Sequence, residues 1–109
     1  MSDKEIVWLH GEVKTPPFSS EARIEAGHLL RLLQQGKSLS MPQSRLMRVV
    51  GVRCHELRIR NVDLTSQIIL RIDADAVVIL EVFEKKTTTT PKQVIQVCEN
   101  RLALYDSEA

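Results

Sequence analysis

The segment VVILEVFEKKTTTTPKQ, from Val77 to Gln93, carries the strongest structural signals in the chain. It opens with four apolar, mostly β-branched residues, a pattern that favours a strand buried in the middle of a sheet. Two lysines and four threonines follow. Thr90 and Gln93 match a helix capping box, and Pro91 stands at the first helical position, where its missing N–H is no loss. We therefore expect a central strand, two lysines (Lys85 and Lys86) where the strand ends, and a helix that runs to about Leu104.

The length and composition are those of one ordinary globular domain, residues 1–109. Hydrophobic residues make up 43% of the chain and charged residues 27%, which is close to the average for soluble domains. No apolar run approaches the roughly 18 residues of a membrane span, and the N-terminus lacks the pattern of a signal peptide. Cys54 and Cys98 have no metal-ligand spacing, so we interpret both as reduced core thiols. These features predict a cytoplasmic protein without a membrane segment.

The net charge of +1 is unevenly distributed along the chain. Residues 37–71 contain seven lysines and arginines against two acidic residues, a net charge of +5, so the rest of the chain carries −4. A localised basic region is typical of a protein that binds a polyanion such as nucleic acid. Arginines are also common on solvated strand faces, and charge alone does not separate these two interpretations.

The first part of the chain predicts an edge strand and a helix. Residues 4–9, KEIVWL, favour a strand. The Ser-Ser-Glu run at 19–21 suits a helix N-terminus, and Gly36 is expected to end the helix. The buried face of this helix consists of apolar residues that recur at helical spacing. They are Ala22, Ala26, Leu29, Leu30 and Leu33. Residues 37–50 are interpreted as an irregular connection.

Three further strands are expected to form an antiparallel meander. Residues 52–60 alternate polar and apolar side chains, residues 66–72 do the same after a turn, and the strand that begins at Val77 follows a second turn. The predicted fold is α+β: a small antiparallel sheet, built from the N-terminal strand and the meander, with both helices packed on one face. The other face is expected to be open. It would gather Glu56, Arg58, Arg60, Gln67, Arg71, Glu81 and Lys85.

Several motifs in the chain resemble one known family. They are RLMRVVG at 45–51, HELRIR at 55–60, and VFEKKT at 82–87 with the Thr90-Pro91 pair that follows. They are similar to the phage-derived, HigB-like branch of the RelE/ParE toxin superfamily. The pattern there is Lys-Pro-Met-Lys, a glycine, a Tyr-Glu-Ile-Arg strand and a Phe-x-Lys-Lys-Thr-x-x-Thr-Pro segment that opens a helix. The helix segment at 25–36 is similar as well, and the resemblance extends over nearly the whole chain from Trp8. It implies a RelE-like fold.

The resemblance also implies a function, that of the toxin in a type II toxin–antitoxin system. Such a toxin enters the ribosomal decoding site and cuts messenger RNA, without a metal or other cofactor. Its partners would be messenger RNA, the ribosome and a helix-turn-helix antitoxin, and a homodimer is a further option. In this chemistry a ribose 2′-OH loses a proton and attacks the adjacent phosphate, whose developing charge is met by preorganised cations. Arginine suits the phosphate because its planar fork donates two hydrogen bonds.

The resemblance implies catalytic roles for Arg58 first, then for Lys85 and Lys86, with Glu81 as the candidate base. Six other residues would contact RNA. They are Arg45, Arg48, Arg60, Gln67, Arg71 and Lys92. No metal ligands are expected. By strand alternation His55 points to the apolar face, so we do not expect an imidazole acid–base pair.

The chain departs from the family pattern at positions that bear on activity. Ser66 and Gln67 stand where many relatives have Tyr-Arg, Glu81 stands where relatives often have histidine, and His55 replaces the usual tyrosine. Gln67 cannot neutralise charge, and Glu81 would repel a phosphate unless it acts as the base. The alternative function is therefore a non-catalytic binding module of the same fold, either an antitoxin-binding co-repressor or a decayed toxin.

Overall fold

The computed structural model describes residues 3–9, 20–39, 43–60, 65–85 and 90–108, without the side chains of Arg60, Glu84 and Lys85. The Cα radius of gyration is 13.1 Å, the value expected for a folded domain of about 100 residues. None of the helices in the described ranges is long and apolar enough to cross a membrane.

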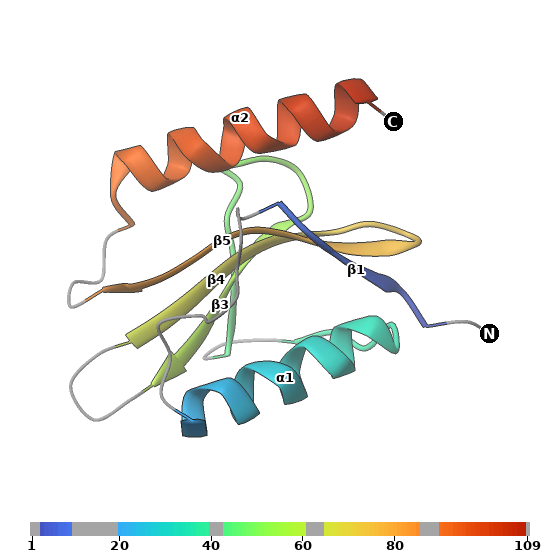
Figure 1. The fold of residues 1–109 in the computed structure, drawn as a ribbon, viewed down its shortest axis with the longest axis vertical. Helices are drawn as coiled ribbons and strands as arrows, with labels where there is room; N and C mark the ends of the chain where they lie inside the picture. Colours follow the sequence, from blue (N-terminus) through green and yellow to red (C-terminus); the bar gives the residue numbers. More distant parts are fainter. Residues whose placement is uncertain (1–2, 10–19, 40–42, 61–64, 86–89, 109) are drawn as a thin grey trace.

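The described residues form five strands and two helices, which Figure 1 shows as a sheet between two helical layers. The elements are β1 Glu5–Trp8, α1 Ser20–Gln34, β2 Ser44–Leu46, β3 Cys54–Arg60, β4 Thr65–Ile72, β5 Ala76–Lys85 and α2 Lys92–Glu108. The strands lie in the order β1-β5-β4-β3-β2. β1 is parallel to β5, and the other neighbours are antiparallel. The α+β class and the three-strand meander are confirmed.

Two features of the sheet differ from the prediction. The sequence predicts an irregular connection at 37–50, but Ser44–Leu46 pairs with β3 as an edge strand. A strand of three residues is too short to show alternation in the sequence. The sheet is also mixed rather than wholly antiparallel, because β1 runs parallel to β5 with Glu5 opposite Ala76.

The strand predicted to be central is an interior strand, second in the order, while β4 occupies the centre. β5 pairs with β1 on one side and with β4 on the other. Its residues Val77–Leu80 have no solvent exposure, and neither do Ile69 and Leu70 on β4. Consecutive residues of a strand point to opposite faces, so both faces of these two strands are buried.

The two helices cover opposite faces of the sheet, which corrects the prediction that both pack on one face (Figure 1). α1 packs on the face that presents Ile68, Leu70 and Ile79. α2 packs on the other face, over Ile69 and Val78. Strands that are apolar on both faces need a cover on both. Among the described side chains, the polar ones predicted to lie on an open face therefore lie on the face of the sheet that carries α2.

The α1 helix begins at Ser20, and its predicted apolar face is buried. Gly36 follows the helix with a φ of 83°, a left-handed conformation that favours glycine. The Gly36 N–H donates to the Leu33 carbonyl at 3.0 Å, and the Lys37 N–H donates to the Leu32 carbonyl at 3.1 Å. These bonds satisfy carbonyls at the end of the helix, so the predicted helix and its end are confirmed.

The α2 helix begins after Thr90 and Pro91 as predicted, and it continues to Glu108, beyond the predicted end near Leu104. Cys98, on its sheet-facing side, is fully buried and free, as expected of a core thiol. Burial raises the pKa of this thiol to about 12, which keeps it protonated at neutral pH.

A set of ion pairs holds the C-terminal end of α2 against the sheet. The Arg71 guanidinium, on β4, donates to both carboxylate oxygens of Asp106 at 2.8 and 2.9 Å. It also donates to both oxygens of Asp73 at 2.8 and 3.0 Å, and its carbon lies 5.8 Å from the centre of the Tyr105 ring. The hydrogen bonds from Arg71 lower the pKa of Asp106. This contact stabilises the last turns of the helix, beyond Leu104.

Replacing Asp106 by asparagine should lower the free energy of unfolding by about 0.5–1 kcal/mol near neutral pH. The effect is small because the Asp106 side chain is 54% exposed and solvent screens the ion pair. A carboxyl with a lowered pKa stabilises the fold above its ordinary pKa of 3.8, and the contribution is lost as the pH falls through the lowered pKa. The difference between wild type and Asp106→Asn should therefore be constant above that value and shrink below it.

Urea denaturation across this pH range measures the difference. The control is Glu108→Gln, an exposed change near the same end of α2 that should have no measurable effect. A loss in Asp106→Asn that persists undiminished in acid would contradict the role of the ion pair.

Candidate functional site

Glu56, on β3, is a carboxylate with no solvent exposure. Arg45 on β2 donates to its Oε1 at 3.0 Å, and the Thr90 hydroxyl, just before α2, donates to its Oε2 at 2.8 Å. Gln67 on β4, oriented with its amide nitrogen toward the carboxylate, donates to the two oxygens at 2.8 and 2.9 Å. We refer to these four residues as the Glu56 cluster. It joins β2, β3, β4 and the segment before α2.

The Glu56 cluster compensates the energetic cost of burying a charged carboxylate. Burying a carboxylate costs several kcal/mol unless donors and a compensating charge replace the lost water. Arg45 supplies the positive charge, and its side chain is 37% exposed whereas that of Glu56 is not exposed at all. The buried carboxylate therefore holds one guanidinium in a fixed position at the surface.

Arg58 lies two residues beyond Glu56 on β3, and therefore on the same face of the sheet. Its register partner on β4 is Gln67, whose own partner on β5 is Phe83. This row across three strands consists of a half-buried arginine, a buried amide and a half-buried aromatic ring. Within the described part of the chain, the Arg58 guanidinium makes no hydrogen bond or ion pair. It is therefore available to an anionic ligand.

The ends of β3 and β5 carry two more of the predicted cations. The backbones of Arg60 and Lys85 both pair with Thr65 of β4, so the sheet brings these two positions to one row. That row lies two residues beyond the Arg58 row. The side chains of Arg60 and Lys85, and the whole of Lys86, lie outside the described residues.

Glu81 and Arg71, two other predicted site residues, have partners within the fold. The Glu81 side chain is 15% exposed, and its Oε2 lies 3.5 Å from Nη1 of Arg101 on α2. Its Oε1 accepts a hydrogen bond from the Val82 N–H at 3.0 Å. Arg71 is held by the two aspartates described above. These contacts give both side chains structural roles at the interface with α2.

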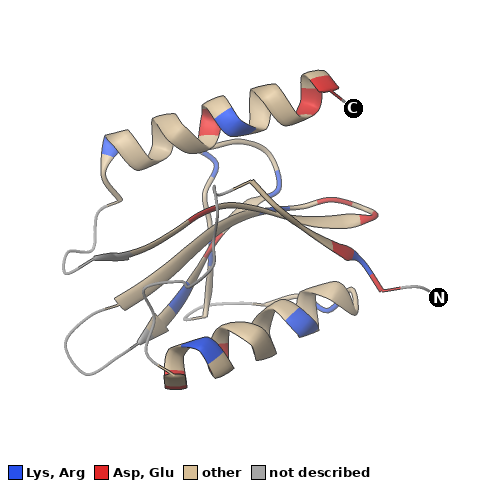
Figure 2. Cartoon of the chain, in the orientation of Figure 1, with Lys and Arg blue, Asp and Glu red and all other residues tan. Residues whose placement is uncertain are grey.

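Arg48 and Lys92, the remaining predicted RNA-binding residues, are exposed. Arg48 follows β2 by two residues, and Lys92 follows Thr90 by two, so both flank the Glu56 cluster in the chain. Acidic residues gather elsewhere: Figure 2 shows them at the C-terminal end of α2 and at the turn between β4 and β5. The two ends of α2 thus differ in charge, an arrangement that can orient a polyanion.

The sequence prediction missed the roles of Glu56 and Thr90. It placed Glu56 on an open face and gave Thr90 only a capping role. The Thr90 hydroxyl proton goes to Glu56, which leaves the oxygen able to accept a capping bond. These two residues are 34 positions apart, and only the pairing of β3 with its neighbours brings the cluster together. No local pattern in the sequence predicts that contact.

Comparison with known families identifies the family of this chain. Residues 17–103 match the family model described as Phage derived protein Gp49-like (DUF891). The match covers most of the chain, so the protein belongs to this family, which is part of the RelE/ParE-like toxin fold group. No significant match was found among curated proteins or among solved structures. The family agrees with the resemblance carried by the motifs between 45 and 87.

Removing Arg45 and removing Glu56 should lower the free energy of unfolding by different amounts. Arg45→Met leaves a buried carboxylate without its compensating charge, and should lower the free energy of unfolding by about 3–5 kcal/mol. Glu56→Gln leaves an arginine that reaches solvent. It should cost less, about 1–3 kcal/mol, for the lost charge-assisted hydrogen bonds. Urea denaturation at neutral pH measures both values.

The matched control is Arg48→Met, because Arg48 is an exposed arginine three residues beyond Arg45 in the chain. It should change the free energy of unfolding by no more than about 0.5 kcal/mol. If Arg45→Met proves less destabilising than Glu56→Gln, Glu56 is not a buried group that depends on the charge of Arg45.

Proposed function

We propose that this protein is the HigB-like toxin of a type II toxin–antitoxin system and that it cuts messenger RNA on the ribosome without a metal. The observation that carries the proposal is Arg58, a half-buried cation with no partner among the described residues. It lies beside the Glu56 cluster on a sheet of the toxin fold group. A fold seldom leaves a half-buried arginine unpaired unless an outside ligand uses its charge.

The proposed reaction is transfer of the phosphate to a neighbouring oxygen. The ribose 2′ oxygen gives its proton to water and attacks phosphorus, the bond to the 5′ oxygen breaks, and that oxygen takes up a proton from water. The products are a 2′,3′-cyclic phosphate and a 5′-hydroxyl end. Arg58 would donate two hydrogen bonds to the phosphate oxygens as their charge grows. Lys85 and Lys86, at and after the end of β5, would supply further positive charge.

Glu81 is the weaker part of the predicted catalytic set. A general base has to reach the proton that it removes. The Glu81 carboxylate is 15% exposed and lies close to Arg101 on α2. We therefore assign the rate enhancement mainly to the cations and not to this carboxylate.

Gln67 is compatible with an active toxin, although many HigB-like relatives have arginine at this position. The Gln67 side chain is fully buried and donates to both oxygens of Glu56. An arginine at position 67 would also lie next to the Glu56 carboxylate. The substitution therefore changes how Glu56 is satisfied, and Arg45 retains the compensating charge.

Messenger RNA would lie across the row of Arg58, Gln67 and Phe83. The Phe83 ring offers a stacking surface for a base, and the exposed Arg48 and Lys92 would contact phosphates on either side. Arg45 and Arg60 would extend this contact along β2 and β3. The partners proposed with this function are messenger RNA, the ribosome and a helix-turn-helix antitoxin that neutralises the toxin.

A second function is favoured by the contact between Glu81 and Arg101. Where relatives often carry histidine, this chain places a carboxylate directed to α2. The alternative is a binding module of the same fold that recognises an antitoxin or RNA without cutting it.

Controlled expression in a bacterial host separates the two functions. The wild type should arrest growth and leave cuts in translated messenger RNA. Arg58→Ala should remove most of the cleavage, since one transition-state donor contributes about 10²–10³ in rate. The measurement is growth together with mapping of messenger RNA 5′ ends.

Arg23→Ala is the matched control, because Arg23 is exposed on α1, on the other side of the sheet. It should behave as the wild type. Soluble wild-type protein that leaves growth and messenger RNA intact would exclude the nuclease and favour the binding module.

A further inference from the structure

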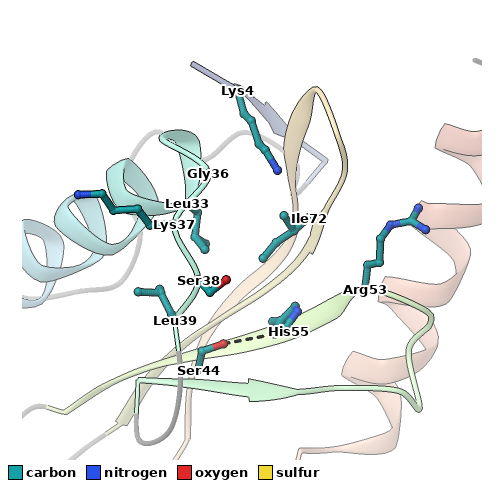
Figure 3. A pocket seen from close by; sticks show the side chains of 10 residues that line it. All are labelled: Lys4, Leu33, Gly36, Lys37, Ser38, Leu39, Ser44, Arg53, His55 and Ile72. Atoms are coloured by element: carbon teal, nitrogen blue, oxygen red, sulfur yellow. Dashed lines mark hydrogen bonds between the residues drawn. The ribbon is translucent and has the colours of Figure 1, made fainter. Parts of the chain in front are cut away.

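A cavity of about 330 Å³ lies on the α1 side of the sheet, at the C-terminal end of that helix. Figure 3 shows its wall, which is built from the end of α1, the residues that follow it, and the adjoining ends of the strands. Glu56 and His55 are neighbours on β3 and point to opposite faces. The cavity is therefore separate from the Glu56 cluster.

The charged residues in the wall of the cavity are all basic. Basic side chains come from Lys4, Lys37, Arg53 and His55, and none of the ten residues that line the cavity is acidic. Hydroxyl groups come from Ser38 and Ser44. Apolar surface comes from Leu33, Leu39 and Ile72. A site with cations, hydroxyls and an apolar wall fits a small anion that carries an apolar group.

Lys4 is the cation best placed to hold such an anion. Its side chain points toward the cavity, whereas that of Lys37 extends away from it (Figure 3). The Lys4 backbone is tied to Gln34 of α1 by two hydrogen bonds of 2.9 Å. Its Nζ donates to the Asp73 carbonyl at 2.8 Å. An ammonium has three donors, so two remain for a ligand.

His55 and Ser44 face Lys4 across the cavity (Figure 3). Ser44 Oγ and His55 Nδ1 lie 3.3 Å apart, and this contact engages one ring nitrogen. Burial lowers the pKa of His55, so the ring is neutral at neutral pH. An anion in the cavity would favour the protonated ring and raise that pKa.

The other charged residues of the wall itself do not oppose an anion. Lys37 and Arg53 are positive. The Asp73 carboxylate, which is not part of the wall, pairs with Arg53 at 3.3 Å and with Arg71 at 2.8 Å. Its negative charge is therefore compensated by two guanidinium groups.

We infer that this cavity is a binding site for a small amphipathic oxyanion, a carboxylate or phosphate monoester with a short apolar body. Lys4 and Ser38 hold the oxyanion together with His55. Leu33, Leu39 and Ile72 contact the apolar body. The site is independent of messenger RNA cleavage, because it lies on the opposite face of the sheet from Arg58.

NMR titration of the histidine ring signals tests this inference, with hexanoate and phenyl phosphate as probes and inorganic phosphate as the probe without an apolar body. Either amphipathic probe should shift the His55 signals and raise the pKa of His55. His28, which is exposed on α1, serves as the internal control and should not shift. Inorganic phosphate should bind at least tenfold more weakly, because roughly 1.4 kcal/mol of apolar contact corresponds to a factor of ten.

Two test variants and one control make the result specific. Lys4→Gln should weaken binding about tenfold or more through loss of one charged donor, and Arg23→Gln, an exposed change on α1 outside the cavity wall, should leave binding unchanged. Leu39→Trp should block the cavity while keeping every cation, and thermal unfolding checks that each variant is folded. The preference between hexanoate and phenyl phosphate identifies the oxyanion. Absence of any His55 shift, or equal binding in Leu39→Trp and wild type, would overturn the inference.

Discussion

The burial of one charged carboxylate, Glu56, is the constraint on which the polar half of this structure depends. A carboxylate without solvent exposure is stable only where several donors converge on it. Here they come from β2, from β4 and from the residue before the N-terminal end of α2. Strand pairing on both sides of β3 and the position of α2 are thus linked through one group. The same group fixes Arg45 at the surface, and the half-buried Arg58 lies two residues beyond Glu56 on the same face of β3.

The two faces of the sheet have different roles in the proposed function. The α1 face has an apolar core beneath the helix, and its packing stabilises the fold. The α2 face has an apolar centre around Cys98 and Leu102 and polar groups at both ends of the helix. Arg71 and Asp106 hold the C-terminal end, and Thr90 and Glu56 hold the N-terminal end. Among the described residues, the arginines at the C-terminal end are paired with aspartates, whereas Arg58, on the same face as Glu56, has no such partner, which is why we place the proposed RNA site near the N-terminal end of α2.

The sequence predicts the fold better than the site, and the reason is physical. Helical spacing and capping residues identify α1 and α2 because these signals are local, and the apolar run at 77–80 identifies the central strand for the same reason. The placement of α2 on the second face depends on Ile69 and Val78, which lie on neighbouring strands. These residues form one apolar surface only after β4 and β5 are paired. The Glu56 cluster depends on contacts between residues up to 34 positions apart. The sequence therefore predicts Gln67 as an RNA contact that lacks the charge of an arginine, whereas in the structure Gln67 is fully buried and is a partner of the Glu56 carboxylate.

The most direct test of this account is the single-turnover rate of messenger RNA cleavage by purified protein on programmed ribosomes, compared among wild type, Arg58→Ala and Gln67→Arg. The account predicts that the wild type cuts, that Arg58→Ala is slower by about 10²–10³, and that Gln67→Arg stays within about tenfold of the wild type because position 67 supports Glu56 and does not contact the phosphate. An inactive wild type that gains cleavage through Gln67→Arg would contradict it.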